Sequence, residues 1–261
     1  GTDDRVVSTD NRVGRILSTT APGSSLSTCT GWQISNGVFL TAGHCVVGGM
    51  QVYELNVPMS TSNGGIIFAN PNDQYPVAQG SFIFENANEG DDWCIFNVNP
   101  NSNTGLLPYQ NGANANVINN RFFRCSWELL PGTSGSTTRI TGFGKDSLPV
   151  GTGGGRNSFN ATNQTHVGPF DAKSGSGNSI KIEYTVDTEP GNSGSPVIIE
   201  GTNTTIGIHT YGDCPLNGVN GGTSFDAQDL ENAINNYLGP GNVYVDVDHP
   251  SIFTFGSVMN P

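Results

Sequence analysis

Charged side chains are scarce in this chain of 261 residues, and positive ones are scarcer than negative ones. Only 12% of the residues are charged, with 10 Lys and Arg against 22 Asp and Glu, so the formal net charge is −12. A protein that binds nucleic acid or an anionic membrane surface needs basic patches, which this composition does not provide. The sequence therefore predicts neither nucleic acid nor a membrane as a partner.

Long apolar runs and metal-binding patterns are also absent from the sequence. No segment approaches the roughly 18 consecutive apolar residues of a membrane-spanning helix. The five cysteines contain no CxxC pair, and no HxxxH spacing occurs, so the sequence predicts no zinc site. The composition is consistent with a secreted protein, and we expect a monomer without a metal or a cofactor.

Gly, Asn, Ser and Thr are abundant instead, which is typical of many short strands joined by turns. The segment Asn97 to about Asn116 is predicted to cross between two halves, and Leu148–Gly177 is predicted to be a long surface loop. Helical periodicity over Asp226–Leu238 predicts one helix before a Gly-Pro stop. The expected strands lie near Arg15–Leu17, Gly31–Ile34, Gly37–Leu40, Gln51–Val57, Ser81–Phe84, Trp93–Phe96, Arg121–Glu128, Thr138–Gly144, Ile180–Val186, Pro196–Ile199 and Thr205–His209.

Two motifs indicate nucleophilic chemistry. The stretch Glu189–Pro196 places Ser193 in a glycine-rich turn, and Thr41–Cys45 places His44 directly after an apolar run. A serine hydroxyl needs a nearby base to become a nucleophile, and histidine is the natural base near neutral pH. The glycines allow a tight turn in which the amides of Gly191 and Ser193 point at one spot and stabilise a negative oxygen.

A third residue must hold the histidine in the correct tautomer. Asp92 is the best candidate, because it directly precedes the apolar strand residues that would fix its position. Asp91 is the alternative.

Taken together, these motifs occur in the order His-Asp-Ser and resemble those of the chymotrypsin-like serine endopeptidases. The resemblance covers about residues 5 to 238. It implies an all-β fold of two antiparallel six-stranded β-barrels, with a short C-terminal helix and a C-terminal extension. The first barrel would comprise residues 1–110 and carry His44 and Asp92, and the second would comprise residues 111–238 and carry Ser193. Residues 239–261 would pack back on the barrels.

Within that family, Thr2–Arg5 and Cys29–Trp32 are similar to the secreted glutamate-specific endopeptidases of bacteria. This resemblance implies that Thr188 and His209 contact the carboxylate of a glutamate before the scissile bond. It also implies that Thr210 lies against the catalytic aspartate. The backbone from Thr210 through Tyr211 to Gly212 would pair with the extended protein or peptide substrate.

Several residues depart from that pattern. Asp187 stands at the base of the pocket, where a carboxylate would favour Lys or Arg, and Glu189 adds negative charge nearby. A trypsin-like preference through Asp187, an inactive binding or toxin-like homologue, and an esterase with the same triad are the alternatives. Asn192 precedes the nucleophile where trypsin-type zymogens carry aspartate, and the chain has no Ile-Val-Gly-Gly start, so activation by a buried amino-terminal ion pair is not expected.

Cys29 and Cys45 would form the family disulfide that braces the histidine loop. The three other cysteines, Cys94, Cys125 and Cys214, leave room for one more bridge. Both a Cys94–Cys125 pair and a Cys94 that is a small buried apolar residue are compatible with the sequence.

Overall fold

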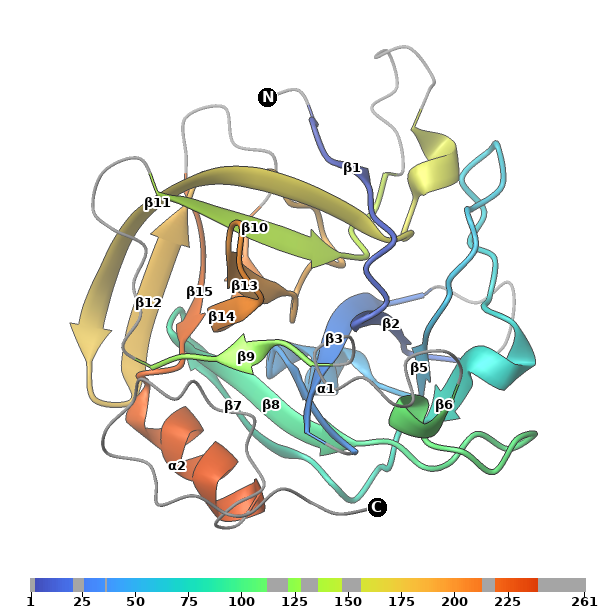
Figure 1. Cartoon of the computed structure of the whole chain (residues 1–261), viewed down its shortest axis with the longest axis horizontal. Coiled ribbons are helices and arrows are strands. Elements are labelled where there is room, and N and C mark those ends of the chain that lie inside the picture. The colour runs from blue at the N-terminus through green and yellow to red at the C-terminus, as the bar shows by residue number, and fades with distance from the viewer. Residues whose placement is uncertain are drawn as a thin grey trace.

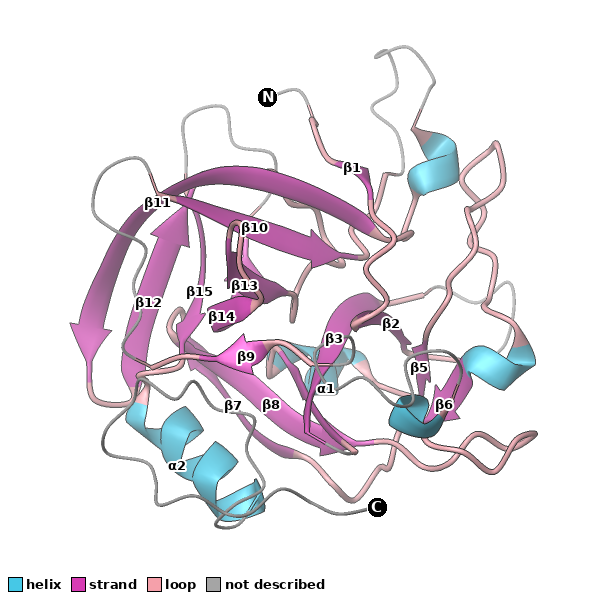
Figure 2. Ribbon diagram, viewed as in Figure 1, coloured by secondary structure: helices cyan, strands magenta, loops and turns pink. Residues whose placement is uncertain are grey.

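The computed structural model describes residues 3–20, 26–35, 37–111, 122–127, 136–146, 156–212 and 219–238. Two sheets lie side by side, antiparallel except for the pair β9–β14, and one longer helix packs beneath them (Figures 1 and 2). The predicted extension at residues 239–261 and Cys214 lie outside the described residues. None of the helices in the described residues has the length and apolar character needed to cross a membrane.

The first sheet has seven strands in the order β6-β5-β2-β3-β4-β8-β7. An isolated bridge between Val77 and Val98 joins the chain after β6 to the chain after β8, so six of the strands curl into a barrel and β7 extends it. The strands are β2 (Val13–Leu17), β3 (Thr28–Ser35), β4 (Val38–Thr41), β5 (Val52–Glu54), β6 (Gln74–Pro76), β7 (Ile83–Asn88) and β8 (Asp91–Asn97).

The second sheet has eight strands, and six of them close on themselves because β11 pairs with both β10 and β12. The long strand β11 curves over this barrel in Figure 1. Its strands are β1 (Val6–Val7), β9 (Arg124–Cys125), β10 (Thr137–Gly142), β11 (Gln164–Ser176), β12 (Ser179–Tyr184), β13 (Pro196–Ile199), β14 (Thr204–Tyr211) and β15 (Asn220–Ser224). The all-β prediction of two antiparallel barrels is confirmed, with β1, β7 and β9 added to the six strands expected in each.

The helices are short apart from the last. The predicted helix at Asp226–Leu238 is confirmed as α2, which begins two residues later, at Gln228, and ends at Leu238. The remaining helical segments are α1 (His44–Gly48), η1 (Pro71–Asp73), η2 (Pro108–Gln110) and η5 (Asn157–Phe159).

One prediction was wrong in its second half. Residues 164–176 were expected to belong to a surface loop, and they form the 13-residue strand β11. Only two of its 13 residues are buried, so the strand lacks the apolar alternation that marks a half-buried strand in the sequence. It is held instead by backbone pairing with three neighbours, β1, β10 and β12.

Aromatic residues fill the space between the two barrels. Trp32 from β3 makes edge contacts with Phe123 and Phe225, at centroid distances of 5.8 and 6.1 Å. Leu230 and Ile234 of α2 belong to the same buried cluster, which also contains residues of β4 and β8. This shared core fixes the first barrel against the second, so residues on facing strands of the two barrels have defined relative positions.

Candidate active site

His44 is positioned by the end of a buried strand. Strand β4 ends at Thr41, and α1 begins at His44 after the tight Ala42-Gly43 link. A Cβ on Gly43 would lie 1.8 Å from the carbonyl oxygen of Glu85, so only glycine fits there. The His44 side chain is 37% exposed, which leaves its ring accessible to a ligand.

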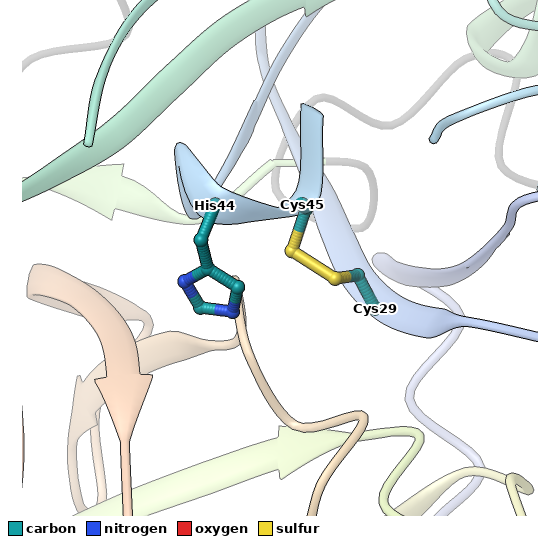
Figure 3. Close-up of side chains that lie close together, drawn as sticks. All are labelled: Cys29, His44 and Cys45. Carbon is teal, nitrogen blue, oxygen red and sulfur yellow. A yellow bond between two sulfur atoms is a disulfide. The ribbon is translucent and has the colours of Figure 1, made fainter. Parts of the chain in front are cut away.

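The expected disulfide between Cys29 and Cys45 is present. It ties α1 to β3 directly beside His44 (Figure 3). Cys94 and Cys125 are free thiols buried in different apolar clusters, so the alternative second bridge does not form and Cys94 is a small core residue. Burial raises the pKa of both thiols, which keeps them protonated and unreactive.

Asp92 holds the imidazole of His44 with two contacts. One carboxylate oxygen lies 2.6 Å from His44 Nδ1, and the other accepts a hydrogen bond of 2.8 Å from the His44 backbone N–H. Because a carboxylate accepts, Nδ1 carries the proton and Nε2 is left with its lone pair outward. The hydroxyl of Thr223 in turn accepts from the backbone N–H of Asp92 and donates to its carbonyl oxygen, at 3.0 and 3.1 Å.

Asp91, the alternative to Asp92, makes no contact with His44 among the described hydrogen bonds. One of its carboxylate oxygens is buried without a hydrogen-bond partner. Burial and the neighbouring Asp229 carboxyl raise the pKa of Asp91 to about 6. The contact with His44 therefore belongs to Asp92.

Ser193 lies in a turn that only glycines permit. Gly191 and Gly194 have φ angles of +110° and +90°, in the region that other residues rarely adopt. The turn is tied to both barrels, because the Ser193 carbonyl oxygen accepts from Thr30 N–H at 2.8 Å and the Gly194 N–H donates to His209 at 2.7 Å.

Two backbone amides of this turn are unoccupied. The N–H groups of Asn192, Gly194 and Ser195 each donate to a carbonyl oxygen. Within the described chain, no acceptor is paired with the N–H groups of Gly191 and Ser193. These two amides were predicted from the sequence to bind a negative oxygen, and their free N–H groups are suited to that role.

A cavity of ≈ 210 Å³ brings these groups together. His44, Gly191, Ser193 and the Cys29–Cys45 disulfide all line it. No hydrogen bond joins the Ser193 hydroxyl to His44 among the described contacts, and such bonds are often long before a substrate arrives. The structure thus assembles a serine, a histidine held by an acid, and two free amides around one space.

The predicted specificity residues do not line this cavity. His209 is buried, and its Nδ1 lies 2.7 Å from the hydroxyl of Tyr184. Burial, with a smaller contribution from His44, lowers the pKa of His209 to about 3, so the ring is neutral at working pH. Thr188 is also buried, and its hydroxyl accepts a hydrogen bond of 2.9 Å from the side-chain amide of Asn220.

Asp187 is engaged away from these residues. Its carboxylate accepts a hydrogen bond of 2.9 Å from the backbone N–H of Asp4. Its own N–H donates to Nδ1 of His166, whose Nε2 lies 4.0 Å from the carboxylate. Asp187, the candidate residue for binding Lys or Arg, is therefore hydrogen-bonded to the amino-terminal segment.

The candidate substrate strand, Thr210 to Gly212, is the end of β14 and the residue after it. The Thr210 hydroxyl is buried and has no partner among the described residues, whereas the resemblance placed it against Asp92. Thr223 makes the described hydrogen bonds to Asp92 instead. Sequence reasoning missed Thr223, Tyr184 and Asn220, since polar residues inside strands carry no motif of their own.

Comparison with known proteins agrees with this arrangement. The family model described as Trypsin matches residues 17–227. The chain is 26% identical over 249 residues to the glutamyl endopeptidase of Bacillus licheniformis, which covers 87% of this chain and 63% of that relative. The chain therefore spans about 63% of the relative's length.

Three solved structures that share this fold include two described as a Glu endopeptidase and a serine protease. A Glu endopeptidase in complex with MPD is similar with a TM-score of 0.57 and 20% identity, covering 91% of this chain and 97% of that one. A thermostable serine protease from an extremophilic microorganism gives a TM-score of 0.57 at 14% identity, with coverage of 87% and 98%. An inactivated protease paralogue of the scabies mite gives a TM-score of 0.55 at 16% identity, with coverage of 86% and 95%. The family match over most of the chain and the shared fold give one conclusion: this chain belongs to the trypsin family of chymotrypsin-like serine proteases.

Proposed function

We propose that the protein is a secreted serine endopeptidase that cleaves peptide bonds after glutamate. Ser193 attacks the peptide carbonyl, His44 takes the proton through Nε2 and passes it to the leaving amine, and Asp92 stabilises the charged imidazole. An acyl-enzyme forms, and water releases it. The observation that carries this proposal is the 2.6 Å contact of Asp92 with His44 beside the cavity shared with Ser193.

The unoccupied amides of Gly191 and Ser193 are proposed to bind the oxyanion of the tetrahedral intermediate. Two donors fixed in advance stabilise charge that develops only in the transition state, and loss of one such donor typically costs about 100- to 1,000-fold in kcat. No metal or cofactor takes part in the proposed reaction. The Cys29–Cys45 disulfide fits an oxidising, extracellular setting.

The glutamate preference rests on His209 and its partner. If the Tyr184 hydroxyl donates to Nδ1, the neutral ring of His209 must carry its proton on Nε2 and can donate it to a carboxylate. Thr188 adds a hydroxyl that is held by Asn220. A substrate glutamate would therefore meet two hydrogen-bond donors, the Nε2–H of the neutral His209 ring and the Thr188 hydroxyl.

Asp187 is the charge that opposes this preference. A carboxylate about 8 Å from a substrate glutamate would repel it by about 2 kcal/mol at an effective dielectric of 20. The hydrogen bond from Asp4 and the nearby ring of His166 satisfy the Asp187 carboxylate outside the pocket, which favours glutamate over Lys or Arg.

The test is a matched set of peptides with Glu, Asp, Gln, Lys, Arg, Phe or Leu before the scissile bond. Wild type should cleave the Glu peptide best, and His209→Ala should lower its kcat/KM by about 100-fold, the loss of one buried charge-assisted hydrogen bond. Tyr184→Phe should lower it by about tenfold, because the tautomer of His209 is no longer fixed. Cleavage after Lys or Arg that survives His209→Ala would assign the pocket to Asp187.

Catalysis itself is tested separately. Ser193→Ala should abolish turnover and labelling by a phosphonylating inhibitor, with the thermal unfolding midpoint nearly unchanged. A folded wild-type protein that cleaves no peptide and takes no label would instead be a binding homologue. Hydrolysis of esters but of no peptide would identify an esterase.

A further inference from the structure

The cavity beside Ser193 is lined by His44, the residue proposed to protonate the leaving amine. It is lined by His44, the Cys29–Cys45 disulfide and Gly48-Gly49, and none of the candidate glutamate-pocket residues takes part in it. A peptide that places its side chain near His209 and its carbonyl at Ser193 continues past His44 with the residues that follow the scissile bond. Those residues therefore enter this cavity.

Lys145 is the cationic side chain that lines this space. No carboxylate belongs to the lining residues. The chain has two other lysines. Lys173 is ion-paired with Asp226, and Lys181 is ion-paired with Glu89 and Glu183. Among the described residues Lys145 has no such ion pair, so its ammonium is free to meet a carboxylate of the substrate.

The backbone of Lys145 is held from both sides. Its N–H donates to Pro190 at 2.9 Å, and its carbonyl oxygen accepts from the guanidinium of Arg5 at 3.0 Å. The neighbouring carboxylate of Asp146 is already bound by Arg5 and Arg156 at 3.0 Å each. Asp146 therefore does not neutralise the Lys145 ammonium. The Lys145 backbone is held in place next to the turn that carries Ser193.

We propose that Lys145 makes this cavity a subsite for an acidic residue at the first or second position after the scissile bond. The inference rests on the proposed peptidase function of the same site. Successive residues of an extended substrate lie about 3.3 Å apart, and the four-carbon stem of lysine reaches either position. The preferred substrate is then an acidic segment, with a carboxylate on each side of the bond that is cut.

The experiment uses quenched fluorescent peptides that share the best residue before the scissile bond. They carry Glu, Gln or Lys at the first or the second position after it. Wild type, Lys145→Gln, Lys145→Glu and the charge-matched control Lys173→Gln are compared by kcat/KM, and mass spectrometry of the products identifies the bond cut. Comparing Glu with Gln peptides gives a ratio that does not depend on the basal activity of each variant.

Wild type should prefer Glu to Gln by about twofold to fivefold at one of the two positions, the size of a partly exposed ion pair, and this ratio should fall as salt rises. Lys145→Gln should bring the ratio to about one, Lys145→Glu should favour the Lys peptide, and Lys173→Gln should behave as wild type. Equal cleavage of Glu and Gln peptides by wild type, or an unchanged ratio in Lys145→Gln, would overturn the assignment.

The proposed function fails in a different way. If no peptide is cut and Ser193 takes no phosphonyl label, the peptidase proposal falls and this subsite falls with it. If peptides are cut only after Lys or Arg, the glutamate preference fails. The Glu to Gln ratio after the scissile bond is then measured on those peptides and still decides the role of Lys145.

Discussion

Replacing Arg5 should weaken catalysis without touching the catalytic groups. Arg5 is buried, and its guanidinium lies 2.7 Å from Asp3, 3.0 Å from Asp146 and 3.4 Å from the side chain of Asn192, the residue before Ser193. A Cβ on Gly144 would lie 2.0 Å from the Asn192 side-chain oxygen and 2.1 Å from Arg5 Nη1, so the packing there is tight. Arg5 thus supports the Ser193 turn where trypsin-type zymogens use an amino-terminal ion pair.

The magnitude follows from what is left behind. Removing one partner of a buried charge pair costs about 3–5 kcal/mol, and Arg5→Ala belongs at the lower end because Arg156 also contacts Asp3 and Asp146, at 3.1 and 3.0 Å. If the Ser193 turn shifts by about 1 Å, kcat should fall by about 100-fold, whereas KM should change little.

The assay combines urea unfolding with steady-state kinetics on the best peptide, at a temperature where each variant is folded. Arg5→Lys serves as the matched variant, because it keeps the charge but loses the planar set of guanidinium N–H donors. Its kcat should lie between those of wild type and Arg5→Ala. Arg5→Ala with lower stability and an unchanged kcat would contradict a role of Arg5 in catalysis, since Arg5 would then only stabilise the fold.

Three further predictions concern stability. Asp91→Asn should stabilise the fold above pH 6 by about 1–2 kcal/mol, because the raised pKa of about 6 means that ionising Asp91 costs folded stability and solvent screening reduces that cost. Below pH 4 the carboxyl is protonated in both states, so chemical unfolding across pH should show the gain disappear there. Replacing both Cys29 and Cys45 by Ser should lower the unfolding free energy by about 3 kcal/mol, the chain-entropy value for a loop of about 15 residues. Under reducing conditions the variant and wild type should have the same unfolding free energy. Gly194→Ala should cost about 1–3 kcal/mol and most of the activity, because it forces a side chain to φ +90° with its Cβ 2.1 Å from a backbone oxygen; calorimetry that shows an unchanged midpoint would contradict this.

The residues predicted for the site were those whose chemistry is local in the sequence. Ser193 and His44 each lie in a short motif, and Asp92 directly precedes an apolar strand, so their types and spacing were enough to propose them. Their roles in catalysis remain predictions until the variants are measured. Residues that act through tertiary contacts were not predicted, because Thr223 reaches Asp92, and Tyr184 reaches His209, only once the strands have paired.

Strand prediction failed where pairing, and not burial, holds the strand. In β11 few side chains are buried, and Gly168 is required there because a Cβ would lie 1.8 Å from the carbonyl oxygen of Thr185. The sequence 164–176 is therefore rich in small and polar residues although it is a strand. By contrast, Trp93–Phe96 in β8 is a continuous apolar run, and its prediction as a strand was confirmed.

The hydrogen bonds between the barrels have a consequence for how the protein loses activity. Thr30 of the first barrel holds the backbone of Gly191 and Ser193, and Thr223 of the second holds Asp92. Separation of the barrels breaks these bonds together with the alignment of nucleophile and base. Loss of activity on heating then reports the separation of the two barrels, which can occur before either barrel unfolds. An inhibitor that binds both Ser193 and His44 should hold the two barrels together and raise the melting temperature of both.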